Sequence, residues 1–349
     1  MAKVHLRLLG VAVALIVCGV VVLIYFLDSE SGTGGLPGTN KIPSRLLAPA
    51  SMRGVGTGFI DRSGAFVIPP TYSRAYPFSE GLALVQKGPY FGFIDTSGAV
   101  RIPITRPAAS VDVGLSMFGN FVGFSSGLFL VHDQEAGPYY IDKAGKNAFG
   151  CHFDQASDFL EGRAVVRRKG DNAFTVISPE GNTIGTILDE TSVFSCSGSL
   201  INVRRGVGVG YIGWDGKEVV PCVYDWVSVF SEGLCVAYKE GEPVVFYDEN
   251  GQQILKPGSL LAMGFHDGYC PVGYWDAEGP CKFGLIDKDG KVVLDYKWWS
   301  VAEYTLGLWA VQDNETRKWG YLDLKGRWVI EPKYSSAKPF TDPERTNVY

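Results

Sequence analysis

The sequence predicts an all-β repeat protein: a closed eight-bladed β-propeller that follows one N-terminal transmembrane helix. Three observations indicate this fold class. A short marker ending in Gly returns eight times, each period holds several segments of strand-forming residues, and the series begins and ends with incomplete units that complement each other. An open β-superhelix built from the same units is the alternative.

The repeat marker is an apolar pair, an Asp in most copies, two further residues and a Gly. Its copies end at Gly64, Gly98, Gly145, Gly181, Gly216, Gly251, Gly290 and Gly326. Most steps between them are close to 36 residues, and the one longer step indicates an insertion near Ala108 to Asn120. Self-similarity at a fixed period of this length is typical of solenoids and propellers.

Two further phrases return between the markers. One reads PFSEGLALV at residues 77–85, and the other, Tyr-x-x-Ala/Val-x-x-Phe, reads YSSAKPF at residues 334–340. In this order the phrases resemble the WG-repeat family of bacterial proteins from residue 57 to about residue 340. The Trp-Gly pair itself survives only at Trp319-Gly320, and the middle repeats are degenerate. The resemblance implies a non-catalytic module.

Each unit, of about 36 residues, is predicted to contain three to four short antiparallel strands, A to D. They correspond to YSRAYPF (72–78) for A, GLALV (81–85) for B, FGFID (91–95) for C and FVIP (66–69) for D. These segments are rich in aromatic and β-branched residues and are joined by turns in which Asp caps the backbone and Gly takes a positive φ. Because an isolated unit leaves two strand edges unpaired, the units must stack on one another.

The two ends of the repeat region predict how the ring closes. Strands C and D at Thr57–Ile68 come before the first A strand, and an A strand at Tyr334–Phe340 follows the last C and D strands at Trp319–Ile330. The final residues, Thr346–Tyr349, are a candidate for the missing B strand. The two incomplete units therefore complete one shared blade, which an open superhelix does not require.

The N-terminus predicts a single-pass membrane anchor. At about 1.5 Å per residue, the uncharged apolar run of residues 8–27 reaches about 30 Å, the thickness of the hydrocarbon layer. The flanking charges place residues 1–7 in the cytoplasm and the repeats outside it, in the periplasm or at the cell surface. A cleaved signal peptide and a lipoprotein signal at Cys18 are the alternatives. A flexible linker is predicted for residues 28–50, and the repeat domain for residues 51–349.

Catalytic and metal-binding patterns are sparse in the predicted exported part. Its histidines are His132, His152 and His266, and no two have a metal-ligand spacing. One repeat position carries a recurring carboxylate, at Glu80, Glu161, Glu232 and Asp267. Hydrolysis by paired carboxylates needs two of them about 5–10 Å apart. Equivalent positions on neighbouring blades tend to lie further apart, and turn chemistry explains the recurrence, so we expect no enzyme, no cofactor and no metal. A cell-envelope hydrolase that uses these carboxylates is the alternative. The basic stretch Arg163 to Lys169 is interpreted as a solvated strand end.

Six cysteines lie in the predicted exported part, and an even number permits disulfides. The turn at Asp276–Gly279 folds a B strand back on the following C strand and sets Cys270 opposite Cys281. We therefore predict a disulfide between these two residues. The pairing of the others is left open: Cys151, Cys196, Cys222 and Cys235.

Aromatic side chains are the remaining signal for binding. Trp226, Trp298 and Trp299 lie on or beside predicted A strands, the innermost strands of a propeller, and exposed aromatics near the central channel suit a peptide or a sugar. We expect a monomeric, membrane-anchored recognition or scaffolding module that binds a protein or a cell-envelope glycan. The net charge of −5 argues against nucleic acid as the partner.

Overall fold

In the computed structural model of the chain, the described residues are 46–110, 123–187, 192–274 and 281–345. Residues Pro43–Tyr349 belong to one compact unit. The predicted anchor at residues 8–27 and the candidate strand Thr346–Tyr349 lie outside the described residues. Within the described ranges, no helix has the length and apolar character needed to cross a membrane.

The described strands form seven four-stranded antiparallel sheets and one two-stranded sheet. Three of the sheets, in chain order, are β4–β7 (Arg74–Ala75, Leu82–Lys87, Tyr90–Asp95, Val100–Pro107), β10–β13 (Phe153–Ala156, Ala164–Arg168, Phe174–Ile177, Thr183–Ile187) and β14–β17 (Ser192–Ser197, Leu200–Arg205, Gly208–Gly213, Glu218–Tyr224). Three more are β18–β21 (Trp226–Val227, Leu234–Tyr238, Val245–Asp248, Gln253–Leu255), β22–β25 (Leu261–Ala262, Tyr269–Tyr274, Lys282–Asp287, Val292–Trp298) and β26–β29 (Val301–Thr305, Leu308–Gln312, Trp319–Leu322, Trp328–Tyr334). The two-stranded sheet is β8 (Leu128–Asp133) with β9 (Gly137–Asp142), and a short 3-10 helix, η1 (Ala108–Ser110), precedes it.

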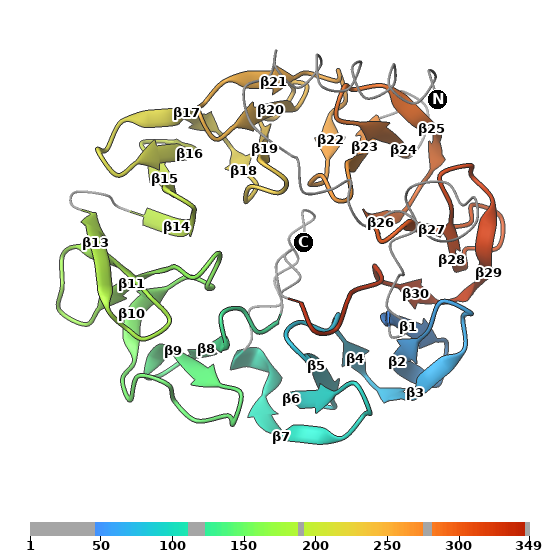
Figure 1. Cartoon of the computed structure of the whole chain (residues 1–349), viewed down its shortest axis with the longest axis horizontal. Coiled ribbons are helices and arrows are strands. Elements are labelled where there is room, and N and C mark those ends of the chain that lie inside the picture. Colours follow the sequence, from blue (N-terminus) through green and yellow to red (C-terminus); the bar gives the residue numbers. More distant parts are fainter. Residues whose placement is uncertain (1–45, 111–122, 188–191, 275–280, 346–349) are drawn as a thin grey trace, which may run out of the picture. The chain divides into compact units, whose positions relative to one another are not determined.

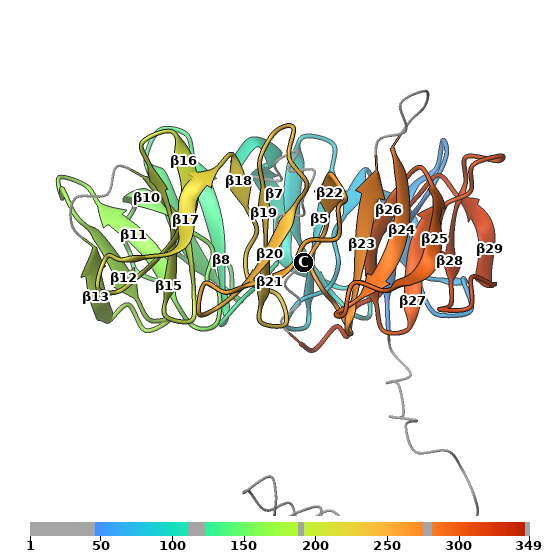
Figure 2. The same cartoon turned by 90° about the horizontal axis from the view of Figure 1, so that it is seen from above.

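The sheets are arranged around a common centre like the blades of a propeller (Figure 1). In the blades built from four consecutive strands, the first strand, such as β14 or β26, lies innermost and the last, such as β17 or β29, lies at the rim. In the side view the strands cross the thickness of the ring, so the connections gather on two faces (Figure 2). The fold is therefore an all-β propeller with seven four-stranded blades. The sequence predicts eight blades, and at the place of the remaining unit the described residues show the two-stranded sheet β8–β9.

The seventh four-stranded blade joins the two ends of the repeat region. It has the order β3 (Phe66–Tyr72), β2 (Gly56–Ile60), β1 (Ala48–Met52) and β30 (Ser336–Ala337). Ala50 of β1 pairs with Ala337 of β30. The predicted shared blade is confirmed, and the ring is closed rather than an open superhelix.

The origin of the B strand in this blade differs from the prediction. Residues 48–50, assigned to the linker from the sequence, begin β1, and Leu47 forms an antiparallel bridge with Thr341. The segment LLAPA (46–50) occupies the place that GLALV (81–85) holds in another blade, and the side chains of Leu46, Leu47 and Ala48 are buried. Burial of this short apolar segment between blades outweighs its linker-like composition.

The turns between strands C and D follow the predicted chemistry. The carboxylate of Asp61 accepts hydrogen bonds from the backbone N–H of Ser63 at 2.9 Å and of Ala65 at 3.2 Å, and Gly64 has a φ of 77°. All eight glycines of the marker have positive φ. In the equivalent turn, hydrogen bonds from the Ser97 hydroxyl and from Arg101 lower the pKa of Asp95 to about 2. The repeated Asp and Gly are therefore explained by turn geometry.

The hydrophobic core is divided into clusters, several of which span neighbouring blades. One cluster combines Leu130 and Tyr140 of β8–β9 with Phe153 and Val166 of β10–β13. A recurring hydrogen bond reinforces such contacts: a C-strand tyrosine hydroxyl donates to a backbone carbonyl of the next blade, in the pairs Tyr140 with Ser157 at 2.6 Å, Tyr211 with Ser228 at 2.9 Å and Tyr321 with Lys338 at 2.8 Å. Each blade thus depends on its neighbours for burial.

Candidate functional site

One face of the ring carries the turns between strands A and B and between strands C and D, which we call the turn belt. The A–B turns hold six residues other than Gly at positive φ: Glu80, Ser126, Glu161, Glu232, Asp267 and Leu306. Each is followed by a Gly that also has positive φ. This is the backbone of a tight hairpin turn with two left-handed residues.

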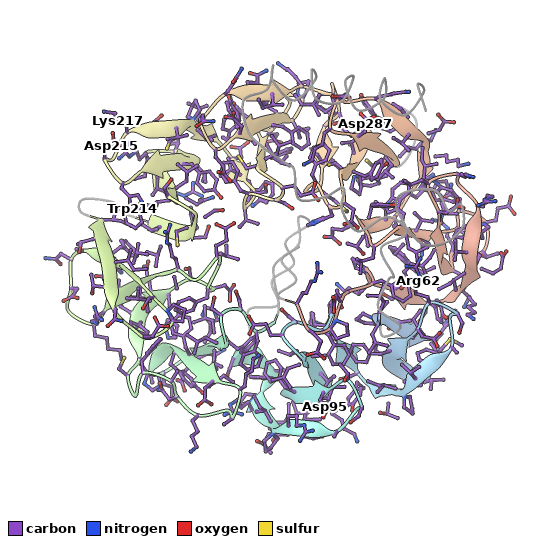
Figure 3. All side chains as sticks on the ribbon, viewed as in Figure 1. Arg62, Asp95, Trp214, Asp215, Lys217 and Asp287 are labelled. Carbon is purple, nitrogen blue, oxygen red and sulfur yellow. The ribbon has the colours of Figure 1, made fainter. Side chains whose placement is uncertain are left out.

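The recurring carboxylates of the turn belt bind the next blade. Glu80 accepts the N–H groups of Ser126 and Gly127 at 2.7 and 2.9 Å. The same contact joins Glu161 to Gly198, Glu232 to Gly268, and Asp267 to Leu306. A later blade also contacts the one before it. Arg62, labelled in Figure 3, lies in the turn between β2 and β3, and it donates a hydrogen bond to the carbonyl of Leu306 in the preceding blade at 3.1 Å. The recurrence of acid at this position is therefore explained by fastening one blade to the next.

A serine and a histidine meet in the turn belt without forming a nucleophile pair. The Ser231 hydroxyl donates to the carbonyl of Phe265 at 2.5 Å, and its oxygen lies 3.4 Å from Nδ1 of His266. Equivalent hydroxyls make the same blade-to-blade bond, from Ser79 to Phe124 and from Thr305 to Phe340, both at 2.8 Å. The Ser231 proton is thus engaged in a structural contact. Burial lowers the pKa of His266, against the opposing charges of Glu303, Glu232 and Asp267.

His266 is expected to make the stability of the ring fall at mildly acidic pH. Because its pKa is lower in the folded chain than the value of about 6.5 in an unfolded one, the unfolded chain binds more protons just below that pH, and the free energy of unfolding decreases there. The substitution His266→Ser introduces the residue type that stands at the equivalent positions 79 and 231 of other blades. We expect the variant to differ by about 1 kcal/mol or less at pH 8 and to lose less stability between pH 7 and pH 5. Thermal melts across this range test the prediction, and equal pH slopes for both proteins would contradict it.

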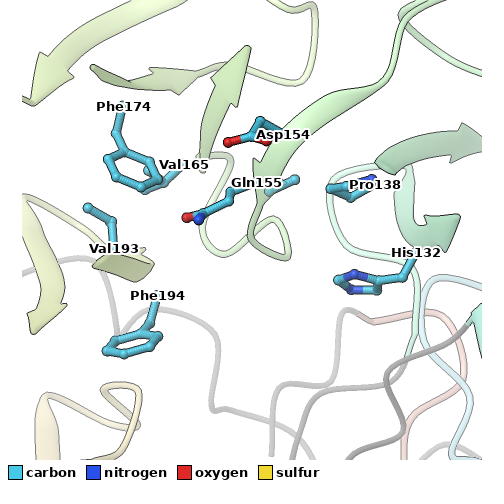
Figure 4. A pocket seen from close by; sticks show the side chains of 9 residues that line it. His132, Pro138, Asp154, Gln155, Val165, Phe174, Val193 and Phe194 are labelled. Atoms are coloured by element: carbon cyan, nitrogen blue, oxygen red, sulfur yellow. The ribbon is translucent and has the colours of Figure 1, made fainter. Parts of the chain in front are cut away.

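A pocket of about 290 Å³ lies on the opposite face, where strands B and C are connected and the A strands begin (Figure 4). It is lined by His132, Pro138, Asp154, Gln155, Ala156, Val165, Phe174, Val193 and Phe194. These residues come from the two-stranded sheet β8–β9 and from the two blades that follow it. Both innermost strands at the pocket, β10 and β14, contain a register shift, between Phe153 and Gln155 and between Val193 and Ser195.

The pocket combines aromatic rings with charged groups. Arg167 stacks over the ring of Phe174, with Cζ 5.1 Å from the ring centroid, and its Nε donates to Asp154 at 2.7 Å. Arg204 lies over the ring of Phe194 at 5.7 Å. The side chain of Phe194 is 46% exposed, which is unusual for a large aromatic group on an innermost strand. Such a site offers apolar contact and charge-assisted hydrogen bonds together.

The three tryptophans proposed from the sequence do not meet at one site. Trp226 lies on the innermost strand β18, as predicted. Trp298, however, is the last residue of the outermost strand β25, is 8% exposed and packs edge-to-face on Trp328 with 5.6 Å between ring centroids. Trp299 follows it, outside any strand, with Arg317 stacked 4.1 Å above its ring. Trp298 therefore precedes the A strand β26 in the chain but lies on an outermost strand and not on an innermost one.

The reason is that in several units the aromatic residue that opens the A phrase belongs to the preceding outer strand. Tyr72 and Tyr334 end β3 and β29 in the same way and are buried. In these units the chain turns inward only after this residue, so the A strands begin two or three residues later than the sequence pattern suggests. Trp298 fills a core position between blades.

The disulfide prediction is contradicted by the register of β23 and β24. Cys270 lies opposite Ile286 rather than opposite Cys281. At ~3.4 Å per residue, this displacement of five residues along the ladder is about 17 Å, far beyond the ~7 Å limit for a disulfide. Both cysteines are free thiols, and so are the other four cysteines in the described part of the chain. The register is set by burial, because it brings Cys270, Val272 and Ile286 into one core cluster.

The repeat phrases match a known family. The sequence profile described as WG containing repeat matches residues 58–88, 140–171, 210–242 and 319–343. The chain contains WG repeats. This result confirms the resemblance seen in the sequence. No curated protein matches the chain in sequence.

Solved structures resemble the WG-repeat ring in fold alone. A eukaryotic initiation factor aligns with a TM-score of 0.52 and 11% identity, over 87% of this chain and 100% of that chain. BamB from Moraxella catarrhalis aligns with a TM-score of 0.47 and 11% identity, over 86% and 93% of the two chains. AztD from Citrobacter koseri aligns with a TM-score of 0.44 and 14% identity, over 84% and 96%.

The structure explains why the Trp-Gly pair of WG repeats contains a Gly. This position on strand C holds Gly58, Gly92, Gly210, Gly284 and Gly320. At each, an added Cβ would lie 2.3–2.8 Å from a carbonyl oxygen of strand D, which passes the Gly in an irregular register. None of the five has positive φ, so the requirement is for space and not for backbone conformation. The Gly allows strand D to bulge against strand C.

The sequence interpretation missed the pocket of this WG-repeat chain. Its lining residues lie in the degenerate middle repeats and adjoin the basic stretch Arg163 to Lys169, for which the sequence predicts only a solvated strand end. One signal was present in the sequence. The pair Arg204-Arg205 stands one unit after Arg167-Arg168 at the same repeat position.

Proposed function

We propose that this WG-repeat chain is a non-catalytic recognition or scaffolding module that binds a protein segment at the pocket between β10 and β14. The observation that carries the proposal is the exposed ring of Phe194 beside two arginines that stack on pocket aromatics. Exposed aromatic groups and Arg are enriched where proteins bind other proteins. A cell-envelope glycan is the second ligand class expected from the sequence.

The hydrolase alternative has less support. It needs the recurring carboxylates of the turn belt as acid and base, and several of these accept hydrogen bonds from the N–H groups of the next blade. Carboxylates engaged in this way favour a structural role.

We further propose that residues 8–27 anchor the chain in the cytoplasmic membrane, with the repeats outside the cytoplasm. The length of the apolar run and its flanking charges support this arrangement.

We also propose that β8–β9 is the middle of an eighth blade. Its place in chain order between two complete blades and its match to strands B and C support that count. The Ser125–Leu128 bridge before it is equivalent to the Ser79–Leu82 bridge of the preceding blade.

Photo-crosslinking in intact cells tests the proposed recognition site. A photoreactive phenylalanine replaces Phe194 in the full chain, and a matched control carries the same residue at Tyr90, an exposed aromatic position in another blade. We expect one partner protein to crosslink from position 194 and not from position 90. Adducts that are identical at the two positions, or that contain glycan and no protein, would exclude a protein-binding pocket.

A further inference from the structure

We infer that the pocket binds an acidic peptide in extended conformation, whose carboxylate is held by Arg204 and whose backbone pairs with the edge of β14 that no other described strand occupies. This inference rests on the proposed function and specifies the chemistry of the partner. Three features of the site lead to it: the local charge, the way Arg204 is held, and the strand edge beside it.

The charge at this part of the ring is unlike that of the other blades. Strands β11 and β15 end in Arg167-Arg168 and Arg204-Arg205. Among the described units, no other B strand carries two basic residues at these repeat positions. Lys169 follows the first pair and is exposed. Five cations therefore stand on two neighbouring blades of a chain whose net charge is −5.

Only part of this charge is neutralised by the described residues. Arg167 pairs with Asp154 at 2.5 Å, and Arg205 lies 4.0 Å from Glu218. In the described ranges, no carboxylate lies within ion-pair distance of Arg168, Lys169 or Arg204. A ligand that brings carboxylates would complete the charge balance.

Arg204 is positioned to receive such a group. Its guanidinium lies over the pocket-lining ring of Phe194, and its one hydrogen bond within the described structure is a long one, 3.4 Å, to the carbonyl of Val207. A guanidinium has five N–H donors in a rigid fork that matches a carboxylate. Stacking on the ring reduces the conformational freedom that Arg204 would lose on binding.

The edge of β14 favours a peptide over a glycan. Strand β14 spans Ser192–Ser197 and is the longest of the described innermost strands, several of which have two residues. It stands at the end of its sheet, so one edge is not paired with another described strand. An extended peptide can add to such an edge through backbone hydrogen bonds, with its side chains alternating between the two faces. A glycan has no such repeating row of donors and acceptors.

Binding of matched peptides to the full chain tests the inference. The probe is a fluorescent octapeptide of alternating Asp and Val with blocked ends, compared with the same peptide carrying Asn for Asp. We expect the Asp peptide to bind at least about 10-fold more tightly, and its affinity to fall as salt is raised. Arg204→Gln should weaken the Asp peptide about 10-fold without affecting the Asn peptide. Lys325→Gln removes the same charge from an exposed turn on the other face and should change neither.

The outcomes separate this inference from the proposed function. Equal binding of the two peptides, no binding of either, or no effect of Arg204→Gln overturns the acidic-peptide inference, while a protein adduct at position 194 would still support a recognition site. A polyuronate oligosaccharide that competes with the Asp peptide at equal charge would show that charge alone is recognised, and would also overturn it. If Arg204→Gln unfolds the chain, the double variant Arg168→Gln/Lys169→Gln provides the same test at exposed positions, with an expected loss of at least about 3-fold.

Discussion

Deletion of residues 335–349 is expected to destabilise the whole propeller and not only its last unit. The deletion removes β30, leaves the edge of β1 unpaired and takes Phe340, which is 1% exposed, out of a cluster shared with Leu308 and Tyr321 of the preceding blade. Loss of a buried Phe side chain alone costs about 3–5 kcal/mol. Since domains are stable by only about 5–15 kcal/mol, we expect the truncated chain to lose cooperative unfolding or to melt at least 15 °C lower.

A circular permutant provides the control. Thr341 and Leu47 already form a bridge equivalent to Ser79 with Leu82, so the dipeptide Glu-Gly placed between them would recreate the A–B turn of the other blades. New ends at Gly241, in the exposed connection after β19, leave every described strand in place. The permutant lacks the buried side chain of Leu46, so we expect it to melt below the wild type but well above the truncated chain, as followed by circular dichroism. A truncation that melts like the wild type would show that closure contributes little to stability.

Much of the fold follows from the sequence because its repeated residues act locally. Asp61 and Gly64 need only a few neighbouring backbone groups to form their turn, so the same pattern predicts eight equivalent turns. Closure was also predictable from the order of strands at the two ends. The features that were missed depend on distant partners. Ala48–Met52 becomes a strand only because β2 and β30 flank it, and Trp298 is buried only because the next blade covers it.

The candidate site was harder to predict for the same reason. Phe194 and Phe174 are 20 positions apart and sit in repeats where the family pattern is weakest, so periodicity gives no information about either. The register of β23 with β24 shows the same limit. Cys270 lies opposite Ile286, five residues beyond the predicted partner Cys281, because this register buries Cys270 with Ile286, and the turn residues give no sign of it. The recurring carboxylates, which the hydrolase alternative would use, accept hydrogen bonds from the next blade, and that partner could not be identified from the sequence.

The Gly of the WG pair provides the second large expected effect. In Gly210→Ala, the new Cβ would lie 2.4 Å from the carbonyl oxygen of Val220 and 2.7 Å from that of Pro221, both backbone atoms of β17. Neither oxygen can move without breaking the C–D pairing, so we expect the free energy of unfolding to fall by about 3 kcal/mol. Chemical denaturation of the variant and the wild type measures the difference.

Thr175→Ala is the matched control, because it places the same residue at the same repeat position in another blade. There the register is regular, with Thr175 opposite Thr186 and Val176 opposite Gly185, and strand D leaves room for a side chain. The loss of a buried methyl and hydroxyl group should cost about 1 kcal/mol. If the two alanine variants are destabilised equally, the irregular register of strand D is not what requires Gly. If Gly210→Ala alone is severely affected, the bulged D strand explains why WG repeats keep Gly at this position and why the units with Thr175 and Val245 can depart from it.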